Sequence, residues 1–286
     1  MTNRTVFDFD ANGRIAGTHR DDRGVLFFDR SELPEEIDRL RARYGNKPIL
    51  AAGSIGSDKG WLTAPYVAAP ASLADIARAV VETGIPGVTF TPGLSYCDDE
   101  GMPDVMRGEE LQFLGAAAAD LVPPGALLCQ PGTHCKWAKV EGHRITWFRT
   151  AMTGELFGLI ARHSIVIGPD AEPVDPARPE FALGVLSSPR DSLPTLLFRA
   201  RAARVTGKWS ASQCSAYASG VLIGIDVASN LERSNGTVHV LADDRLGPCY
   251  SRAIGLLGAR AVTIDSRTAF ARGAQQVWRS IAGELA

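Results

Sequence analysis

"QPGTHCKWAKVEGHRITWFRTAMTGEL", residues 130–156, contains the pattern that decides the fold of the second half of the chain. Residues 135–140 and 144–149 alternate as strands do, and Glu141-Gly142-His143 separates them, which predicts a β-hairpin. A helical pattern begins at Thr153. Since "GALLCQ" upstream predicts one more strand, this half begins as strand, turn, strand, turn, strand and helix.

The turn Gly132-Thr133-His134 admits three kinds of site. A glycine lets the backbone approach a phosphate closely, neighbouring amides can point into one concavity, and the threonine hydroxyl adds a donor. A cysteine nucleophile would need Cys135 to meet a histidine, but His134 is its neighbour in a strand and points to the opposite face. Zinc is disfavoured because Cys129 and Cys135 lack the usual ligand spacing. The residues alone leave a phosphate site and a cysteine site open.

Working outward, helical and strand patterns alternate along the whole chain, which predicts an α/β fold. An N-terminal hairpin turns at Asn12-Gly13, and a helix follows with Ser31 as its cap and Gly45 as its end. The remaining predicted strands lie at 47–53, 87–93, 237–244 and 260–265, and the remaining predicted helices at 72–84, 108–121, 210–231, 248–258 and 269–285. Residues 169–181 hold four prolines and read as an exposed connection.

Length and composition narrow the class of protein. A chain of 286 residues suits two domains of ordinary size. A net charge of −2 disfavours nucleic acid as a partner, and no apolar run is long enough to cross a membrane. The N-terminus has no secretory pattern and the five cysteines suggest reduced thiols, so a cytoplasmic location is expected.

Two segments of the first half could carry chemistry. The loop "GSIGSDKGW", residues 53–61, follows a predicted strand, and such loops bind ligands in open α/β sheets; its other interpretation is a tight turn with a buried tryptophan. The segment "DVMRGEE", residues 104–110, places three acids and an arginine around a glycine at a helix start. Glu109 and Glu110 are either a solvated first turn or a general base with its orienting partner, and the pattern does not separate them.

Residues 2–15, "TNRTVFDFDANGRI", also echo residues 133–145, "THCKWAKVEGHRI". Both begin with threonine, continue as an alternating strand and end in a glycine turn before Arg-Ile. The echo suggests an internal duplication, in which the first copy lacks the strand and turn that precede the threonine in the second.

The motifs "AAGSIGSDKGW", "DVMRGEELQFLGA", "PGTHCKW" and "FRTAMTGEL", in this order, strongly resemble the 2-dehydro-3-deoxygalactonokinase family. The resemblance implies two RNase H-like domains around a cleft, as in the actin-like ATPase and sugar kinase superfamily. We expect a sugar-binding domain at 1–118 and a nucleotide-binding domain at 119–286. The implied reaction is ATP- and Mg²⁺-dependent phosphorylation of the 6-hydroxyl of 2-dehydro-3-deoxy-D-galactonate, in galactonate degradation.

The resemblance also implies roles for particular residues. The catalytic base would be Glu109 first, Glu110 second and Asp104 third, and Arg107 could hold the substrate carboxylate. The sugar-binding edge would comprise Gly53, Ser54, Gly56, Ser57 and Trp61. The nucleotide side would comprise Gly132, Thr133, His134, Thr153, Gly154 and Gly247, with the first three facing the β and γ phosphates.

The chain departs from the family pattern in two places. Relatives begin with a strand and a first phosphate loop whose aspartate organises Mg²⁺, whereas this chain starts inside that loop, so the first domain is expected to lack its first strand and no metal ligand is assigned. Asp243 and Asp244 stand where a glycine-rich adenosine loop is usual.

Two explanations of the short N-terminus are open. The start site has been placed too far downstream, or the loss is genuine and the chain is a non-catalytic relative that binds sugar acids. The expected partners are a sugar acid and a nucleotide. The preferred epimer and the oligomeric state, a homo-oligomer included, are not decided by the sequence.

Overall fold

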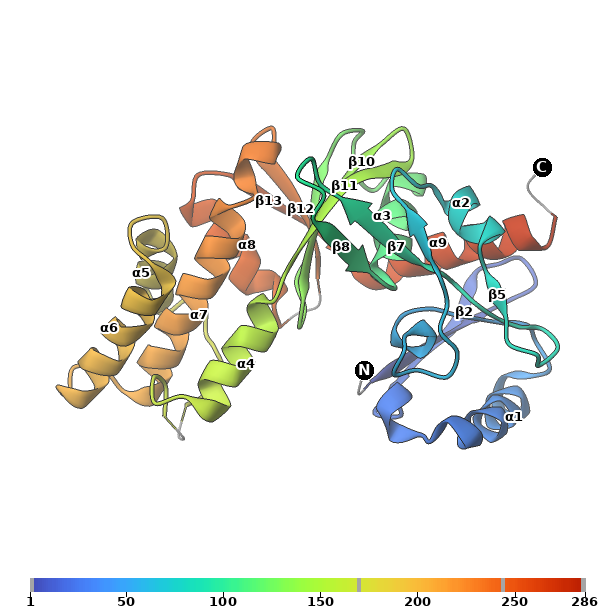
Figure 1. Ribbon diagram of the computed structural model, residues 1–286, viewed down its shortest axis with the longest axis horizontal. Helices are drawn as coiled ribbons and strands as arrows, with labels where there is room; N and C mark the ends of the chain where they lie inside the picture. The colour runs from blue at the N-terminus through green and yellow to red at the C-terminus, as the bar shows by residue number, and fades with distance from the viewer. Residues whose placement is uncertain (1–2, 169–170, 243–244, 284–286) are drawn as a thin grey trace. The chain divides into compact units, whose positions relative to one another are not determined.

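The computed structural model describes residues 3–168, 171–242 and 245–283, and it shows an α/β protein that divides into two compact units (Figure 1). Unit 1 is the described part of Met1–Pro124, Val140–Trp147 and Arg267–Ala286; unit 2 is that of Gly125–Lys139 and Phe148–Ser266. The predicted α/β class with two domains is confirmed. Within these described ranges, no helix is long and apolar enough to cross a membrane.

Unit 2 is organised around a five-stranded sheet in the order β11-β10-β9-β12-β13, which is the strand order of an RNase H-like domain. β9 pairs antiparallel with β10 and parallel with β12, and β12 pairs parallel with β13. The parts of β10 and β11 nearest their connecting turn belong to unit 1. The strands are β9 (Leu127–Gln130), β10 (Cys135–Glu141), β11 (Arg144–Ala151), β12 (Thr237–Ala242) and β13 (Arg260–Asp265). The predicted hairpin and the strands around it are therefore confirmed.

The helices of unit 2 gather on α7 (Ala211–Ala228), against which α4, α5, α6 and α8 all pack. Figure 1 shows α5 and α6 running alongside α7. The small residues of α7 allow neighbours on most sides, and 13 of its 18 residues are buried. The other helices are α4 (Thr153–His163), α5 (Pro179–Ser187), α6 (Leu193–Val205) and α8 (Gly247–Leu256). Sequence patterns predicted α4, α7 and α8, whereas α5 and α6 were not predicted.

Unit 1 contains three small sheets in place of one continuous sheet: β1-β2, β3-β6-β5 and β4-β7-β8. Its strands are β1 (Arg4–Phe9), β2 (Ile15–Asp21), β3 (Ile49–Ala51), β4 (Tyr66–Ala68), β5 (Val81–Glu82), β6 (Val88–Phe90), β7 (Gly93–Cys97) and β8 (Pro103–Met106). Its helices are α1 (Leu33–Tyr44), α2 (Leu73–Arg78), α3 (Glu109–Ala118) and most of α9 (Ser266–Ile281).

β1 and β3 border one cavity of about 1100 Å³, and every residue of both strands lines it. Among the described residues β1 pairs with β2 alone and β3 with β6 alone, so each leaves an edge without a sheet partner.

The C-terminal helix α9 belongs with unit 1, although the predicted boundary at 118/119 assigns it to the second domain. Gly115 of α3 and Gly273 of α9 bring the two helix backbones into contact. A Cβ on Gly115 would lie 2.0 Å from the carbonyl oxygen of Ala269, and one on Gly273 would lie 2.1 Å from that of Leu111. Phe270 also stacks on Phe7 of β1 with ring centroids 5.4 Å apart. Close packing of distant segments, which no local pattern reveals, explains this difference.

Two local predictions are corrected. Ser31 does not cap the first helix: a capping box between Asp29 and Glu32 opens a short 3₁₀ turn that leads into α1. The predicted helix at 72–84 ends at Arg78, since Val81 and Glu82 pair with β6 as β5. The β-branched residues Val80, Val81 and Thr83 favour that extended conformation.

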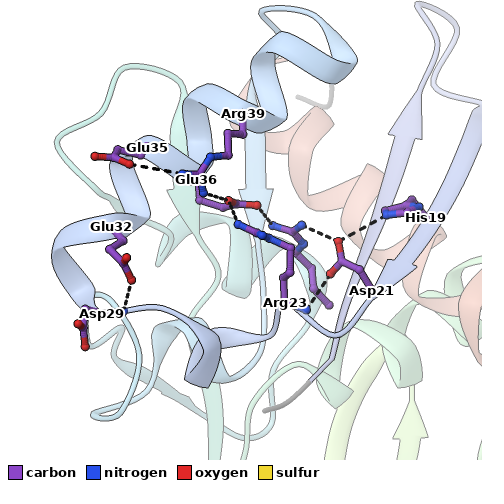
Figure 2. Close-up of polar contacts among 9 residues, drawn as sticks. His19, Asp21, Arg23, Asp29, Glu32, Glu35, Glu36 and Arg39 are labelled. Carbon is purple, nitrogen blue, oxygen red and sulfur yellow. Dashed lines mark hydrogen bonds and ion pairs between the residues drawn. The ribbon is translucent and has the colours of Figure 1, made fainter.

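A buried carboxylate, Glu36, ties α1 to the β1-β2 hairpin. It is 5% exposed and accepts hydrogen bonds from Arg4 (2.6 Å), Arg23 (2.7 Å) and Arg39 (3.0 Å). Figure 2 shows Arg23 and Arg39 directed at this carboxylate. Burial alone would raise the pKa of Glu36, but hydrogen bonds from the three arginines outweigh it and hold the pKa below its ordinary value.

We expect Glu36→Ala to lower the free energy of unfolding of unit 1 by about 2–3 kcal/mol, because it leaves three guanidinium groups without their shared partner. Since the folded-state pKa is lowered, this contribution is present above the ordinary value of 4.5 and is lost as pH falls through the folded value. Urea denaturation at pH 7, with hydrogen exchange of α1 as a local readout, measures it.

Glu35→Ala is the control, since Glu35 is 74% exposed and bonds only weakly to Arg39, at 3.5 Å. Equal losses in the two variants would contradict the role assigned to Glu36.

Candidate functional site

The glycine loop after β3 and the segment before α3 meet in unit 1. Gly53 has φ 88°, and a Cβ on Gly108 would lie 3.1 Å from its Cα. A Cβ on Gly56 would lie 3.2 Å from Nη1 of Arg107. Two segments that the sequence analysis selected separately, 53–61 and 104–110, therefore form one cluster.

Arg107 supplies a fixed positive charge to this cluster. Its Nη2 donates to the carbonyl of Ala64 at 2.8 Å, and its guanidinium carbon lies 4.3 Å from the ring centroid of Tyr66. Its Nε and Nη1 are buried without a hydrogen-bond partner among the described residues. Buried N–H groups normally have partners, so this guanidinium is suited to an added acceptor such as a carboxylate or a water molecule.

The structure separates the two adjacent glutamates that the sequence pattern could not. Glu109 is half-buried and its Oε2 accepts from the amide of Arg107 at 3.0 Å. Glu110 is fully buried, and its two carboxylate oxygens accept from the amide of Gly108 at 2.9 and 2.7 Å. Burial, with a smaller contribution from the charge of Glu109, raises the pKa of Glu110 to about 8. At pH 7 Glu110 is mostly a neutral internal group, and Glu109 is the carboxylate that a ligand can reach.

The other residues of unit 1 that were predicted to form the site differ in their contacts. Asp104 lies in β8 opposite Tyr96, three residues before Arg107. Ser57 closes its own loop by donating to the carbonyl of Ser54 at 2.7 Å. Trp61 packs edge-on against Phe90, with ring centroids 5.6 Å apart. Trp61 is only partly buried, and it lines the cavity of unit 1 together with Gly53 and Ser54.

In unit 2 the parallel pairing of β9 with β12 aligns the carboxyl ends of the two strands. Val238, His239 and Val240 pair with Leu127, Leu128 and Cys129. The Gly132-Thr133-His134 turn follows β9, and Gly247 begins α8 after β12, so both lie at one edge of the sheet. This edge is where open α/β sheets bind ligands. Asp243 and Asp244 lie outside the described residues.

The first turn of α4 packs directly on the Gly132 turn. A Cβ on Gly154 would lie 2.3 Å from the carbonyl oxygen of Gly132. The amide of Glu155 donates to the carbonyl of Thr133 at 2.9 Å, and the Glu155 carboxylate lies 2.6 Å from Nε2 of His134. The start of a helix beside a glycine turn presents backbone amides to an anion, so this edge can hold phosphate groups.

Asp226 is a residue that the sequence analysis missed. It is 5% exposed and accepts from Trp137, Thr153 and Tyr250. The hydroxyl of Thr153 is therefore directed at Asp226. Only the backbone of Thr153 is left to contact a ligand. Asp226 is the one charged residue in the 18-residue helix α7, and this isolation is the signal that could have identified it.

The structure contradicts the cysteine-nucleophile hypothesis. Cys135 is fully buried, and burial raises the pKa of its thiol well above the ordinary value. Its Sγ lies 3.6 Å from that of Cys129, and His134 is bonded to Glu155. Within the part of the chain that the structure describes, no three His, Cys, Asp or Glu side chains form a group that could hold a metal ion.

We expect Glu110→Gln to change how stability depends on pH. The Glu110 carboxyl loses its proton near pH 4.5 in the unfolded chain and at about pH 8 in the folded chain. Between these values deprotonation stabilises the unfolded state, so the free energy of unfolding falls as pH rises. Glutamine keeps an acceptor for Gly108 and carries no charge. The stability of the variant relative to the native chain should increase from pH 4.5 to pH 8, by at most roughly 1.4 kcal/mol per pH unit. Urea denaturation across this range measures the difference, and a constant difference would contradict the prediction.

Comparisons with known proteins place the chain in a family. A family model described as 2-keto-3-deoxy-galactonokinase matches residues 1–277. The 2-dehydro-3-deoxygalactonokinase of Escherichia coli (strain K12) is 34% identical over 240 residues, which cover 82% of this chain and 80% of that protein. A probable 2-dehydro-3-deoxygalactonokinase of Rhizobium meliloti (strain 1021) is 37% identical over 249 residues, covering 82% and 78% of the two chains.

A solved structure agrees with these matches. The crystal structure of a candidate 2-dehydro-3-deoxygalactonokinase from Sinorhizobium meliloti superposes with a TM-score of 0.90 at 31% identity, covering 98% of this chain and 94% of that one. Sequence and fold thus agree along nearly the whole length, and the chain belongs to the 2-keto-3-deoxy-galactonokinase family of carbohydrate kinases.

Proposed function

We propose that this chain transfers the γ-phosphoryl group of ATP to the 6-hydroxyl of 2-dehydro-3-deoxy-D-galactonate. Family membership and the names of the relatives support the class of reaction and substrate. The observation that carries the assignment of roles is the position of Glu109, a half-buried carboxylate held by the backbone amide of Arg107, two residues from a guanidinium with unpartnered nitrogens.

In unit 1, Glu109 would accept the proton of the substrate hydroxyl. Its hydrogen bond from the amide of Arg107 orients one carboxylate oxygen and leaves the other for the hydroxyl. Arg107 would bind the carboxylate of the sugar acid, since two of its nitrogens lack partners among the described residues. The loop from Gly53 to Ser57 would border the sugar.

In unit 2, the amides of the Gly132 turn and of the start of α4 would hold the ATP phosphates. Phosphoryl transfer depends mainly on positioning and on stabilising charge, and preorganised backbone amides supply both. Mg²⁺ bound to the ATP phosphates would neutralise charge that develops on them. The contact between His134 and Glu155 pairs the Glu155 carboxylate, which would lie beside the bound phosphates.

A second candidate function is a relative that binds the sugar acid without turnover. The observation that favours it is the cavity of about 1100 Å³ between β1 and β3, whose edges have no sheet partner among the described residues. A unit with such a cavity is expected to hold its ligand loops less firmly.

A coupled ADP-release assay with ATP, Mg²⁺ and 2-dehydro-3-deoxygalactonate distinguishes the two functions. Turnover by this chain supports the kinase. Absence of turnover, with a melting temperature that the sugar acid still raises, supports the binding relative. A chain that shows no turnover and no thermal shift would overturn both proposed functions.

We expect Glu109→Gln to lower kcat by about 10²–10⁴-fold, the usual contribution of a general base. The amide side chain keeps an acceptor for Arg107, so the loss would be that of the base and not of the loop. Asp104→Asn is the control for the other partly exposed acid of this segment and should keep most of the turnover. Near-normal activity of Glu109→Gln would remove Glu109 as the base.

We expect Gly154→Ala to raise the KM for ATP at least tenfold, because its Cβ would displace the carbonyl of Gly132, 2.3 Å away. Gly158→Ala is a matched control in the same helix: the atoms nearest its Cβ belong to the side-chain guanidinium of Arg162, at 3.0 Å and beyond. Steady-state kinetics at saturating sugar acid measure both, and equal KM values for ATP in the two variants would argue against a phosphate site here.

A further inference from the structure

Asp226 connects the elements that carry the candidate nucleotide-binding residues. Its Oδ1 accepts from Nε1 of Trp137 at 2.8 Å. Its Oδ2 accepts from the hydroxyls of Thr153 at 2.9 Å and Tyr250 at 2.6 Å. Asn230 donates to the backbone carbonyl of Asp226 at 2.8 Å, which fixes the end of α7 around it.

Each donor lies close in sequence to one part of the proposed phosphate edge. Trp137 in β10 follows His134 by three residues, and Thr153 directly precedes Gly154. Tyr250 in α8 follows Gly247 by three residues. One buried carboxylate on α7 is thus hydrogen-bonded to the strand after the turn, to the start of α4 and to the first part of α8.

The geometry of this centre suits a side chain with two acceptor oxygens. Side-chain donors from three other elements converge on it, and Nδ2 of Asn230 lies 3.5 Å from Oδ1. An asparagine in its place would offer one acceptor oxygen in place of two. Burial raises the pKa of Tyr250 well above its ordinary value, so this hydroxyl remains a donor. A buried carboxylate is costly unless it is fully hydrogen-bonded, and here the bonds come from side chains beside the candidate ligand groups.

We propose that Asp226 is a positioning residue for nucleotide binding, which holds the Gly132 turn, the start of α4 and the start of α8 in the arrangement that receives ATP. This inference rests on the proposed function and adds a residue that does not itself touch the ligand. A purely structural role would predict loss of stability with unchanged geometry at the sheet edge in the molecules that remain folded.

The test compares Asp226→Asn with Val221→Ala, a change in the core cluster of the same helix that removes no hydrogen bond. We expect Asp226→Asn to raise the KM for ATP at least tenfold and the KM for the sugar acid less than twofold. Val221→Ala should lower the melting temperature and leave both KM values unchanged. Thr153→Val and Tyr250→Phe each remove one donor and should give intermediate increases in the KM for ATP, which keeps the test decisive if Asp226→Asn does not fold.

Hydrogen exchange of the unliganded chain separates failure of this inference from failure of the proposed function. Asp226→Asn, or each single-donor variant, should accelerate exchange at 131–135 and 153–156 relative to Val221→Ala, whether or not the chain has kinase activity. Exchange and KM for ATP that match those of Val221→Ala would overturn the inference. Accelerated exchange in a chain that neither binds nor turns over ATP would show that Asp226 orders this edge, but it would overturn both the kinase and the role of Asp226 in nucleotide binding.

Discussion

The parallel pairing of β9 with β12 is the constraint on which the candidate nucleotide site depends. It brings the Gly132 turn and the start of α8 to one edge of the sheet, although more than a hundred residues separate them in sequence. The start of α4 joins this edge because the lack of a side chain at Gly154 permits backbone contact with Gly132. Asp226 accepts hydrogen bonds from Trp137 in the strand after the turn, from Thr153 at the start of α4 and from Tyr250 in α8. Backbone geometry and one buried carboxylate thus create an edge rich in amide donors.

In unit 1, a difference in burial distinguishes two adjacent glutamates. Glu109 and Glu110 are chemically identical neighbours, yet Glu109 is half-buried and Glu110 is fully buried. The burial of Glu110 makes it a neutral group that holds the amide of Gly108, and the half-buried Glu109 stays beside Arg107. The contact between Gly53 and Gly108 then places the glycine loop over the same guanidinium. A difference in solvation, and not in residue type, separates the ligand-accessible glutamate from its buried neighbour.

Strong local signals predicted much of the fold. The hairpin at 135–151 followed the alternation of its residues, and α3 began directly after the glycine that precedes two acids. Prediction failed where distant contacts override local preference: β5 replaced the second half of a predicted helix because β6 offered it a partner. Gly115 and Gly273, through which α3 and α9 pack, give no local sequence signal of that contact. The expected boundary at 118/119 therefore differs from the structure in where it places the last helix.

The sequence by itself determined the α/β class, the two-domain organisation, the family and the two segments that carry the candidate chemistry, because each depends on residue types at short, regular spacing. Only the tertiary structure decided which glutamate is accessible, that Thr153 is directed at Asp226, that Cys135 is buried, and that α9 packs in unit 1. These properties depend on solvent exclusion and on hydrogen bonds between residues far apart in the chain. Neither is encoded in a local pattern, since burial and pairing exist only once the elements have packed.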